Sequence, residues 1–260
     1  MNSILKLHVL ASGSKGNCYC LQVDNNLIFV DMGVGIRKIQ AFLSAIPNEA
    51  QLKKTLFITH EHFDHISGLE LFARDYDCLI YAANRTLEIL TGKVSGIKER
   101  VRRIRADEIV EFNGFSARAF SLSHDAVEPL GYVISAGSSI GFLTDTGCWT
   151  DAQAKALECA ETLVLETNHD VEMLRNNKQY PPELKRRILS PQGHLSNNEA
   201  IGLVTTLSCN GKLKSCFFAH VSQHNNGEAH LLPLGEFCQK QFGIKTTILR
   251  QDEYREFNLN

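Results

Sequence analysis

The chain has 260 residues, a formal net charge of −2 and 43% hydrophobic residues, which is ample for a large core. No window approaches about 18 uninterrupted apolar residues, so a membrane-spanning protein is excluded. The first 11 residues lack the basic and apolar segments of a secretory signal. Eight cysteines occur without C-x-x-C pairing, and we expect reduced thiols in a cytoplasmic protein. Cys18 and Cys20 flank Tyr19 and are expected to pack on one face of a strand.

Apolar runs and tight turns predict strands through the first part of the chain, with helices between them. In chain order, we expect strands at 5–10, 19–23, 27–31, 55–58, 79–81, 109–112, 115–120, 131–135, 140–143, 163–165, 215–220 and 245–249. Helical periodicity covers 36–46, 66–73, 84–91, 151–158, 170–176, 183–189, 196–207 and 228–242. There is no repeat and no low-complexity linker. We therefore expect an α+β fold in one domain, residues 1–260, with two sheets packed face to face and helices outside.

The loop after the apolar run at residues 55–58 concentrates residues that bind metals. It reads Thr-His-Glu-His-Phe-Asp-His and offers His60, His62, Asp64 and His65. Imidazole and carboxylate are the ligands that zinc, manganese and iron prefer. The spacing H-x-H-x-D-H gives two ligand pairs from one short loop, which favours a site for two adjacent ions.

Three further ligand candidates each follow an expected strand as its first metal-competent residue: His124, Asp145 and His220. Each also has an ordinary interpretation as a turn or cap residue. Strand ends on one edge of a sandwich converge, so the three are expected to approach the loop at residues 60–65. Together the seven residues supply the ligands that two metal ions need.

Two basic clusters stand out against the near-neutral total charge. Five of the eight residues at 98–105 are basic, including Arg102 and Arg103, and residues 185–187 are Lys-Arg-Arg. A solvated helix face or loop explains them, and so does contact with the phosphates of a polyanion. Arg102 and Arg103 are our candidates for such contacts.

Six segments carry a resemblance to a known family: residues 10–17, 59–65, 123–126, 144–147, 165–175 and 193–197. With them the chain resembles the metallo-β-lactamase superfamily over essentially its whole length, and more narrowly the WalJ/VicX-type branch. The resemblance implies a four-layer αββα sandwich. It also implies a 5′-to-3′ exonuclease on double-stranded DNA, linked to a cell-wall two-component regulatory system.

The resemblance also implies how the metals are held. His60, His62 and His124 would bind the first ion, and Asp64, His65 and His220 the second. Asp145 would bridge the two ions, which could be zinc, manganese or iron. An aspartate at position 145 favours two-metal phosphoesterases and thioesterases over β-lactamases, which would have a cysteine there.

Catalytic roles are expected for Asp64, His194 and Glu166. His194 resembles a histidine beside the scissile phosphate in transfer-RNA 3′-processing relatives, so it is our candidate proton donor. Glu166 would orient that imidazole and raise its pKa. An ordinary helix-start residue before Ser196 is the competing interpretation of His194.

The small-residue turn at residues 12–17 resembles a phosphate-binding turn without being a P-loop, and we expect it to form one wall of the site, either in contact with substrate or as a support for the metal loop. Ser14 and Asn17 are its candidates for substrate contacts. Asn168 and His169 are further candidates, and His169 has an equally good interpretation as a structural residue that fixes loops.

Alternative functions remain open at this point. They are hydrolysis of a small cyclic phosphodiester, glyoxalase II-like thioester hydrolysis, and a nonenzymatic role as a partner of the two-component system. Only 74 residues separate Asp145 from His220, so the inserted domain of β-CASP nucleases does not fit there. A homodimer would help a one-domain nuclease surround a duplex, although nothing in the chain demands it.

Overall fold

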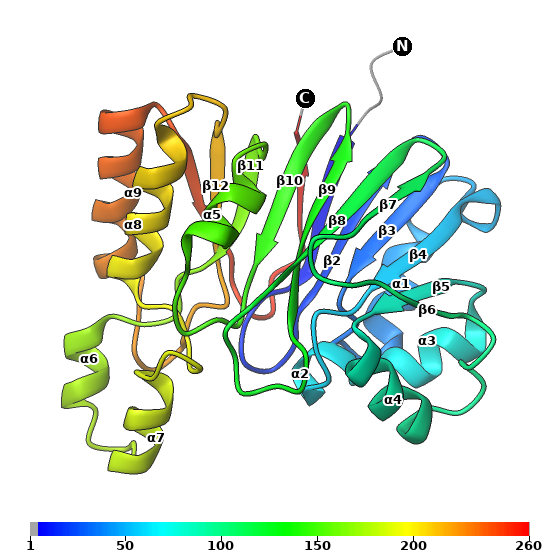
Figure 1. Cartoon of the computed structure of the whole chain (residues 1–260), viewed down its shortest axis with the longest axis horizontal. Coiled ribbons are helices and arrows are strands. Elements are labelled where there is room, and N and C mark those ends of the chain that lie inside the picture. The colour runs from blue at the N-terminus through cyan, green and yellow to red at the C-terminus, as the bar shows by residue number, and fades with distance from the viewer. Residues whose placement is uncertain (1–4, 260) are drawn as a thin grey trace.

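The strands of this computed structural model, which describes residues 5–259, form two seven-stranded sheets (Figure 1). The first sheet has the order β14-β1-β2-β3-β4-β5-β6. Its first four strands are antiparallel neighbours, and β3 to β6 are parallel. The strands are β1 (Leu5–Ala11), β2 (Cys18–Val23), β3 (Asn26–Val30), β4 (Lys53–Phe57), β5 (Leu79–Ala82), β6 (Val101–Arg103) and β14 (Arg255–Asn258).

The second sheet repeats this plan with the order β13-β12-β11-β10-β9-β8-β7. Strands β7 to β10 are antiparallel, and β10 to β13 are parallel. The strands are β7 (Ile109–Phe112), β8 (Phe115–Ser121), β9 (Leu130–Ala136), β10 (Ser138–Leu143), β11 (Thr162–Glu166), β12 (Ser215–Ala219) and β13 (Lys245–Ile248).

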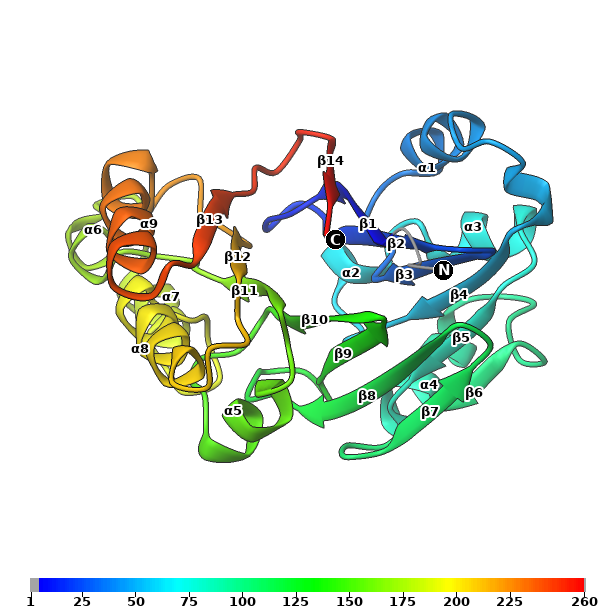
Figure 2. The same cartoon turned by 90° about the horizontal axis from the view of Figure 1, so that it is seen from above.

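Helices cover the outer face of each sheet (Figure 2). Between the strands β3 and β6 of the first sheet, the chain forms α1 (Ile36–Ser44), the 3-10 helix η1 (Glu49–Gln51), α2 (Phe63–Ile66), α3 (Leu69–Asp75) and α4 (Asn84–Lys93). The second sheet carries α5 (Asp151–Leu157), α6 (Val171–Asn176), α7 (Pro182–Ile188), α8 (Asn197–Ser208) and α9 (Glu228–Phe242).

Three hydrophobic cores separate the layers. One lies between the sheets, where Tyr19 and Phe57 of the first sheet meet Tyr132 and Phe142 of the second. A second core packs α1, α3 and α4 on the first sheet, and a third packs α5, α8 and α9 on the second. The helix–sheet–sheet–helix order confirms the expected four-layer αββα sandwich.

Cysteine packing agrees with the sequence interpretation. Cys18 and Cys20 are both fully buried, and both lie in the core between the first sheet and its helices. All eight cysteine thiols of the chain are free. In the described range, no helix is long and apolar enough to cross a membrane.

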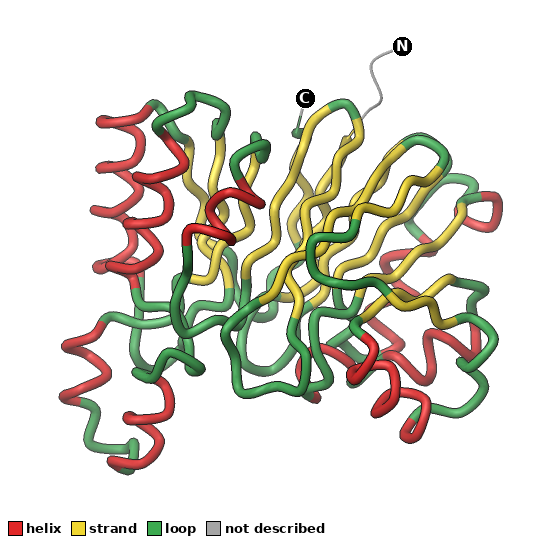
Figure 3. Tube along the Cα trace, in the orientation of Figure 1, coloured by secondary structure: helices red, strands yellow, loops and turns green. Residues whose placement is uncertain are grey.

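Parallel strands place their carboxyl ends at one edge, and the loops that follow gather there, at the lower edge of the sandwich in Figure 3. The loop after β4 and the turns after β10 and β12 all open at this edge. The expectation that the ligand-bearing loops converge is therefore fulfilled by the fold. The short helices α6 and α7 project beyond the same edge (Figure 1).

The expected helix at residues 66–73 is wrong in its start and continuity. Instead α2 begins earlier and contains Asp64 and His65. The helix ends before Gly68, and α3 begins after it. The carbonyl oxygens of Asp64 and His65 accept hydrogen bonds from Asn17 and Met32 rather than from a following helical turn. A Cβ at Gly68 would lie 2.0 Å from the carbonyl oxygen of Val34, so the close approach of that loop requires glycine.

Two edge strands are absent from the sequence expectations. Residues 101–103, inside the first basic cluster, form β6 rather than a helix face or loop. Residues 255–258 form β14 and pair with β1. Both strands are short and largely exposed on one face, so neither has the continuous apolar run by which buried strands are recognised.

Candidate metal centre and active site

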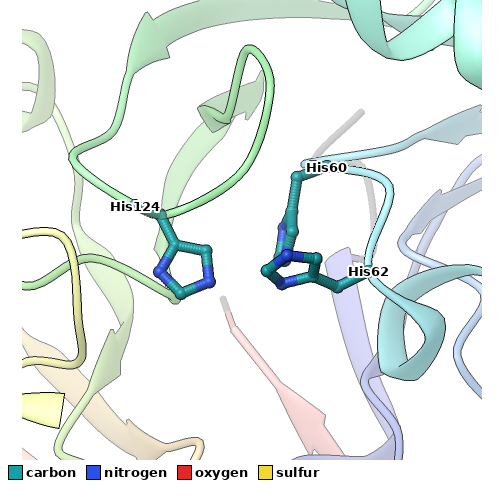
Figure 4. Close-up of side chains that lie close together, drawn as sticks. All are labelled: His60, His62 and His124. Carbon is teal, nitrogen blue, oxygen red and sulfur yellow. The ribbon is translucent and has the colours of Figure 1, made fainter. Parts of the chain in front are cut away.

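Three histidines meet at the open edge of the sandwich. His60 and His62 come from the loop after β4, and His124 comes from the loop after β8 (Figure 4). One ring nitrogen of each lies within 4.8 Å of the others. The Nδ1 atom of His124 lies 3.0 Å from the carbonyl oxygen of Gly193 and donates to it, which leaves Nε2 as a ligand atom.

A second group of four possible ligands adjoins the first. It combines Asp64 and His65 from α2 with Asp145 after β10 and His220 after β12, again within 4.8 Å. His65 Nε2 lies 3.2 Å from Asp145 Oδ2, and His220 Nε2 lies 3.5 Å from Asp145 Oδ1. Each oxygen of Asp145 therefore faces a different histidine of this second group.

A buried carboxylate behind His65 was missed by the sequence analysis. Asp31 Oδ2 lies 2.7 Å from His65 Nδ1, and neither side chain is exposed. Thr59 donates to Asp31 through its backbone N–H and its hydroxyl group. Asp31 follows β3 as Asp145 follows β10, so its position after an apolar strand was an available signal.

Several inward-facing atoms of the cluster lack partners within the protein. His60 Nε2, His220 Nε2 and Asp145 Oδ2 are buried and have no hydrogen-bond partner among residues 5–259. Leaving buried polar atoms unpaired is costly unless another group satisfies them. Nitrogen and carboxylate oxygen are ligands of borderline divalent ions, so the residues present fit a divalent metal centre.

The pKa shifts of His60 and His220 also fit a site for a cation. Burial lowers the pKa of His60, which keeps its imidazole neutral and able to bind a metal. Burial also opposes protonation of His220, but the charges of Asp145 and Glu166 and the hydrogen bond with Glu166 outweigh it and raise the pKa to about 10. The carboxylates thus create a local excess of negative charge that a cation would neutralise.

Backbone strain is concentrated at this centre. Asp31, Asp145 and His220 have φ angles of 60°, 59° and 49°, in the left-handed region that non-glycine residues rarely adopt. Asp31 and His220 directly follow an apolar strand, and Asp145 is separated from β10 only by Thr144. Such strain costs on the order of 1–3 kcal/mol per residue and persists where the surrounding structure enforces it.

His194 and Glu166 form an ion pair beside the second ligand group. His194 Nδ1 lies 2.7 Å from Glu166 Oε1, and the same oxygen lies 2.9 Å from His220 Nδ1. Glu166 is fully buried and also accepts from the backbone N–H of Thr146. Burial works against protonation of His194, but the charge and hydrogen bond of Glu166 outweigh it and raise the pKa of His194.

A cavity of about 130 Å³ opens next to these groups. Its lining residues come from six separate segments: Ser14, His124, Asp125, Asn168, Tyr180, Leu184, Arg187, Ile188, Gly193, His194 and Ser222. Of the expected substrate contacts, Ser14 and Asn168 line this cavity. The side chain of His194 is 22% exposed, so it is accessible from the cavity.

Asn17 and His169 lie behind the site rather than in the cavity. Asn17 is fully buried, and its side-chain amide contacts Gly13, Asp64 and His65. His169 is 1% exposed, and burial lowers its pKa to about 4. Direct contact with substrate is therefore not supported by the position of either residue, and Asn17 instead joins the turn at residues 12–17 to α2.

The two basic clusters differ in their distance from the centre. Arg187 of α7 lines the cavity, and its Nε lies 2.5 Å from Oδ2 of Asp125, the neighbour of His124. Arg102 and Arg103 lie on the edge strand β6, two strands away from β4, and do not line the cavity. The guanidinium of Arg102 donates to the carbonyl oxygens of Glu99 and Val101. The structure thus brings the second basic cluster, not the first, to the site.

The Beta-lactamase superfamily domain model matches residues 26–214, and the chain belongs to this superfamily. Exodeoxyribonuclease WalJ of Streptococcus pneumoniae is 34% identical over 248 residues, covering 92% of this chain and 90% of WalJ. Exodeoxyribonuclease YycJ of Bacillus anthracis is 34% identical over 224 residues, covering 85% and 84% of the two chains. Within the superfamily, the chain therefore belongs to the branch of these two proteins, as its motifs predicted.

The fold has a close likeness among solved structures as well. The metallo-β-lactamase fold protein YhfI from Bacillus subtilis superposes with a TM-score of 0.71, covering 98% of this chain and all of YhfI, at 16% identity. This likeness supports the fold alone. The family model and the two relatives confirm the expected metal-dependent hydrolase of the metallo-β-lactamase superfamily.

Proposed function

We propose that the protein is a two-metal exonuclease that degrades double-stranded DNA from the 5′ end. The observation that carries the proposal is the clustering of seven candidate metal ligands beside the His194–Glu166 pair, next to the cavity that His124 and His194 line. The exodeoxyribonuclease names of the relatives WalJ and YycJ support DNA as the substrate. The class is a metal-dependent nuclease, and the polarity and the preference for duplex DNA are the finer part of the proposal.

The two ligand groups would hold one ion each. His60, His62 and His124 would bind the first, and Asp64, His65 and His220 the second, with Asp145 shared between them. Zinc, manganese and iron all suit this mixture of imidazole and carboxylate. When bound, two such ions supply Lewis-acid stabilisation of the phosphate oxygens and a water molecule of lowered pKa.

The chain's own groups would complete hydrolysis. Water adds to phosphorus, the bond from phosphorus to O3′ breaks, and the proton lost by the water passes to solvent. His194 gives a proton to the leaving O3′, because Glu166 holds Nδ1 and leaves Nε2 for transfer. The raised pKa of His194 favours the protonated form that this step needs.

The DNA backbone would run across the projecting helices. The segment at residues 171–188 contains five basic and two acidic residues, a net charge of +3 in a chain whose total is −2. Arg186 is strongly exposed, and Lys185 lies beside it on α7. Arg102 and Arg103 would contact phosphates farther from the cleavage position.

The proposed location is the cytoplasm, where the DNA substrate is found and thiols stay reduced. The eight free cysteines agree with that location. A single domain spanning residues 1–260 and a homodimer that surrounds the duplex are part of the same proposal. Sedimentation of the protein with and without a DNA duplex tests the dimer.

The test of function is degradation of a 5′-phosphorylated, end-labelled duplex with added Mn²⁺, with Asp145→Ala as the blank. Release of mononucleotides from the 5′ end by the wild type alone is expected. Release from the 3′ end would overturn the polarity. Hydrolysis of a chromogenic phosphodiester without DNA degradation would replace the exonuclease with a small-molecule phosphodiesterase, and inactivity on both would favour thioester hydrolysis.

A further inference from the structure

The cavity beside His194 defines the side of the centre on which the released nucleotide lies. His194 protonates the leaving O3′ in the proposed reaction, so the nucleotide that carries this oxygen occupies the space next to the imidazole. That space is the cavity of about 130 Å³, walled by Tyr180, Leu184 and Ile188 from the turn before α7 and α7 itself. It is well below the roughly 300 Å³ at which pockets for drug-sized ligands begin, so it accommodates part of a single nucleotide and not a duplex.

Arg187 is the cationic side chain of this cavity, and its outer hydrogen-bond donors are uncommitted. Its Nε donates to Asp125, which fixes the guanidinium in place. Within residues 5–259 its two terminal amino groups make no hydrogen bond, and the side chain is 59% exposed. A guanidinium fixed through Nε presents its outer N–H groups as a fork that matches two phosphate oxygens.

In a 5′ exonuclease, the phosphate nearest to the scissile one on the leaving side is the 5′-terminal phosphate. We propose that Arg187 binds this terminal phosphate and makes the enzyme selective for 5′-phosphorylated ends. The inference rests on the proposed exonuclease function and adds the chemical nature of the end that it accepts. Each cleavage leaves a new 5′-phosphate on the remaining strand, so the product of one turnover is the preferred substrate of the next.

Other parts of the cavity suit the remainder of the nucleotide. Ser14, Ser222 and Tyr180 line it, so its wall includes two residues with a hydroxyl group and one with an aromatic ring. The Tyr180 ring is partly exposed and lies 6.2 Å from the ring of His224. Aromatic rings stack on bases without sequence preference, which an exonuclease that removes every nucleotide requires.

The experiment compares kcat/KM for one duplex with 5′-phosphate and 5′-hydroxyl ends, in the wild type and in Arg187→Gln. The wild type is expected to prefer the phosphorylated end. Arg187→Gln should lower kcat/KM for that end roughly tenfold or more, the scale of a charge-assisted hydrogen bond, and change the hydroxyl end less than about twofold. A chromogenic phosphodiester that lacks a terminal phosphate reports whether the metal centre of the variant is intact.

Arg187→Lys separates phosphate binding from the ion pair with Asp125. One ammonium group can keep the contact with Asp125 but cannot also form the outward fork, so the preference for phosphate should be lost in this variant too. Lys212→Gln, an exposed charge at the opposite end of β12, is the matched control and should behave as the wild type.

Two outcomes overturn the inference while the exonuclease function stands: degradation by the wild type without preference for a 5′-phosphate, or equal slowing of both ends by Arg187→Gln. Failure of the wild type to degrade either duplex, with the chromogenic phosphodiester still hydrolysed, overturns the proposed function and the inference with it.

Discussion

Asp31 accepts a hydrogen bond from His65 through Oδ2 and Nδ1, which lie 2.7 Å apart with both side chains fully buried. The contact places a proton on Nδ1 of His65, so Nε2, which faces Asp64 and Asp145, is the nitrogen that would bind a metal. Thr59 holds Asp31 from the loop that carries His60. One buried carboxylate therefore connects the two ligand groups.

Replacement of Asp31 by asparagine should weaken metal binding without removing a ligand. We expect a loss of roughly 10- to 100-fold in Mn²⁺ or Zn²⁺ affinity, because partners that orient a metal-binding histidine contribute on this scale. Competition with a chromogenic chelator measures it. Unchanged affinity in Asp31→Asn, with a fold intact by circular dichroism, would show that His65 needs no such support.

Replacing a metal ligand should reduce turnover more than replacing a residue that only orients a ligand. In His62→Ala and in Asp64→Ala we expect turnover to fall by more than the roughly 100-fold upper range for a supporting residue. His62 and the Asp64 carboxylate lie at the open edge and not in a hydrophobic core, so the variants should stay folded. Calorimetric melting and the DNA degradation assay give the two measurements.

His230→Ala is the matched control for these ligand variants, since it removes a partly exposed imidazole of α9 that belongs to neither ligand group. Wild-type activity is expected from it. Full activity in either His62→Ala or Asp64→Ala would refute the metal mechanism.

The sequence predicted that the seven candidate ligands lie together, and they do, because they follow apolar strands whose carboxyl ends meet at one edge of the sandwich. The same reasoning missed Asp31, which reads equally well as the last residue of its strand. It also missed the contact of Arg187 with Asp125. These residues are 62 positions apart, and only the packing of α7 against the loop after β8 joins them. Periodicity describes single elements and not how two distant ones meet.

The sequence analysis also failed to predict strands that have no buried face. The pattern at residues 98–105 is charged on nearly every position, and β6 exists because its backbone pairs with β5. The start of α2 was also not predicted, because it depends on contacts with a distant part of the chain. Its carbonyl groups bond to a loop that is distant in sequence, which shortens the helix at a point that local propensity does not mark.

The basic residues Lys185 and Arg186 of α7 should dominate the salt dependence of DNA binding. Lys185→Ala with Arg186→Ala should reduce the slope of log K against log salt by up to about 2, roughly one unit for each phosphate that no longer has a cationic partner. Arg102→Ala with Arg103→Ala should have a smaller effect, because β6 is two strands away from the metal loop. Fluorescence anisotropy of a labelled duplex at several salt concentrations gives the slopes.

Lys212→Ala with Lys240→Ala removes the same charge from exposed positions away from the cavity and serves as the control for these double variants. A larger change of slope from Arg102 and Arg103 than from α7 would move the DNA path to the first sheet. Equal slopes in all three double variants would remove both basic clusters from the interface.

The pH dependence of kcat should report the His194–Glu166 pair. A general acid acts in its protonated form, so activity is present below the pKa of His194 and is lost as the pH rises through it. Glu166 raises that pKa, and in Glu166→Gln the alkaline limb of the kcat profile should therefore move to lower pH. In His194→Ala the alkaline limb should be absent. The double variant His194→Ala with Glu166→Gln should have the same pH profile as His194→Ala alone. An alkaline limb that stays in place in Glu166→Gln, or that survives in His194→Ala, would assign the proton to another group.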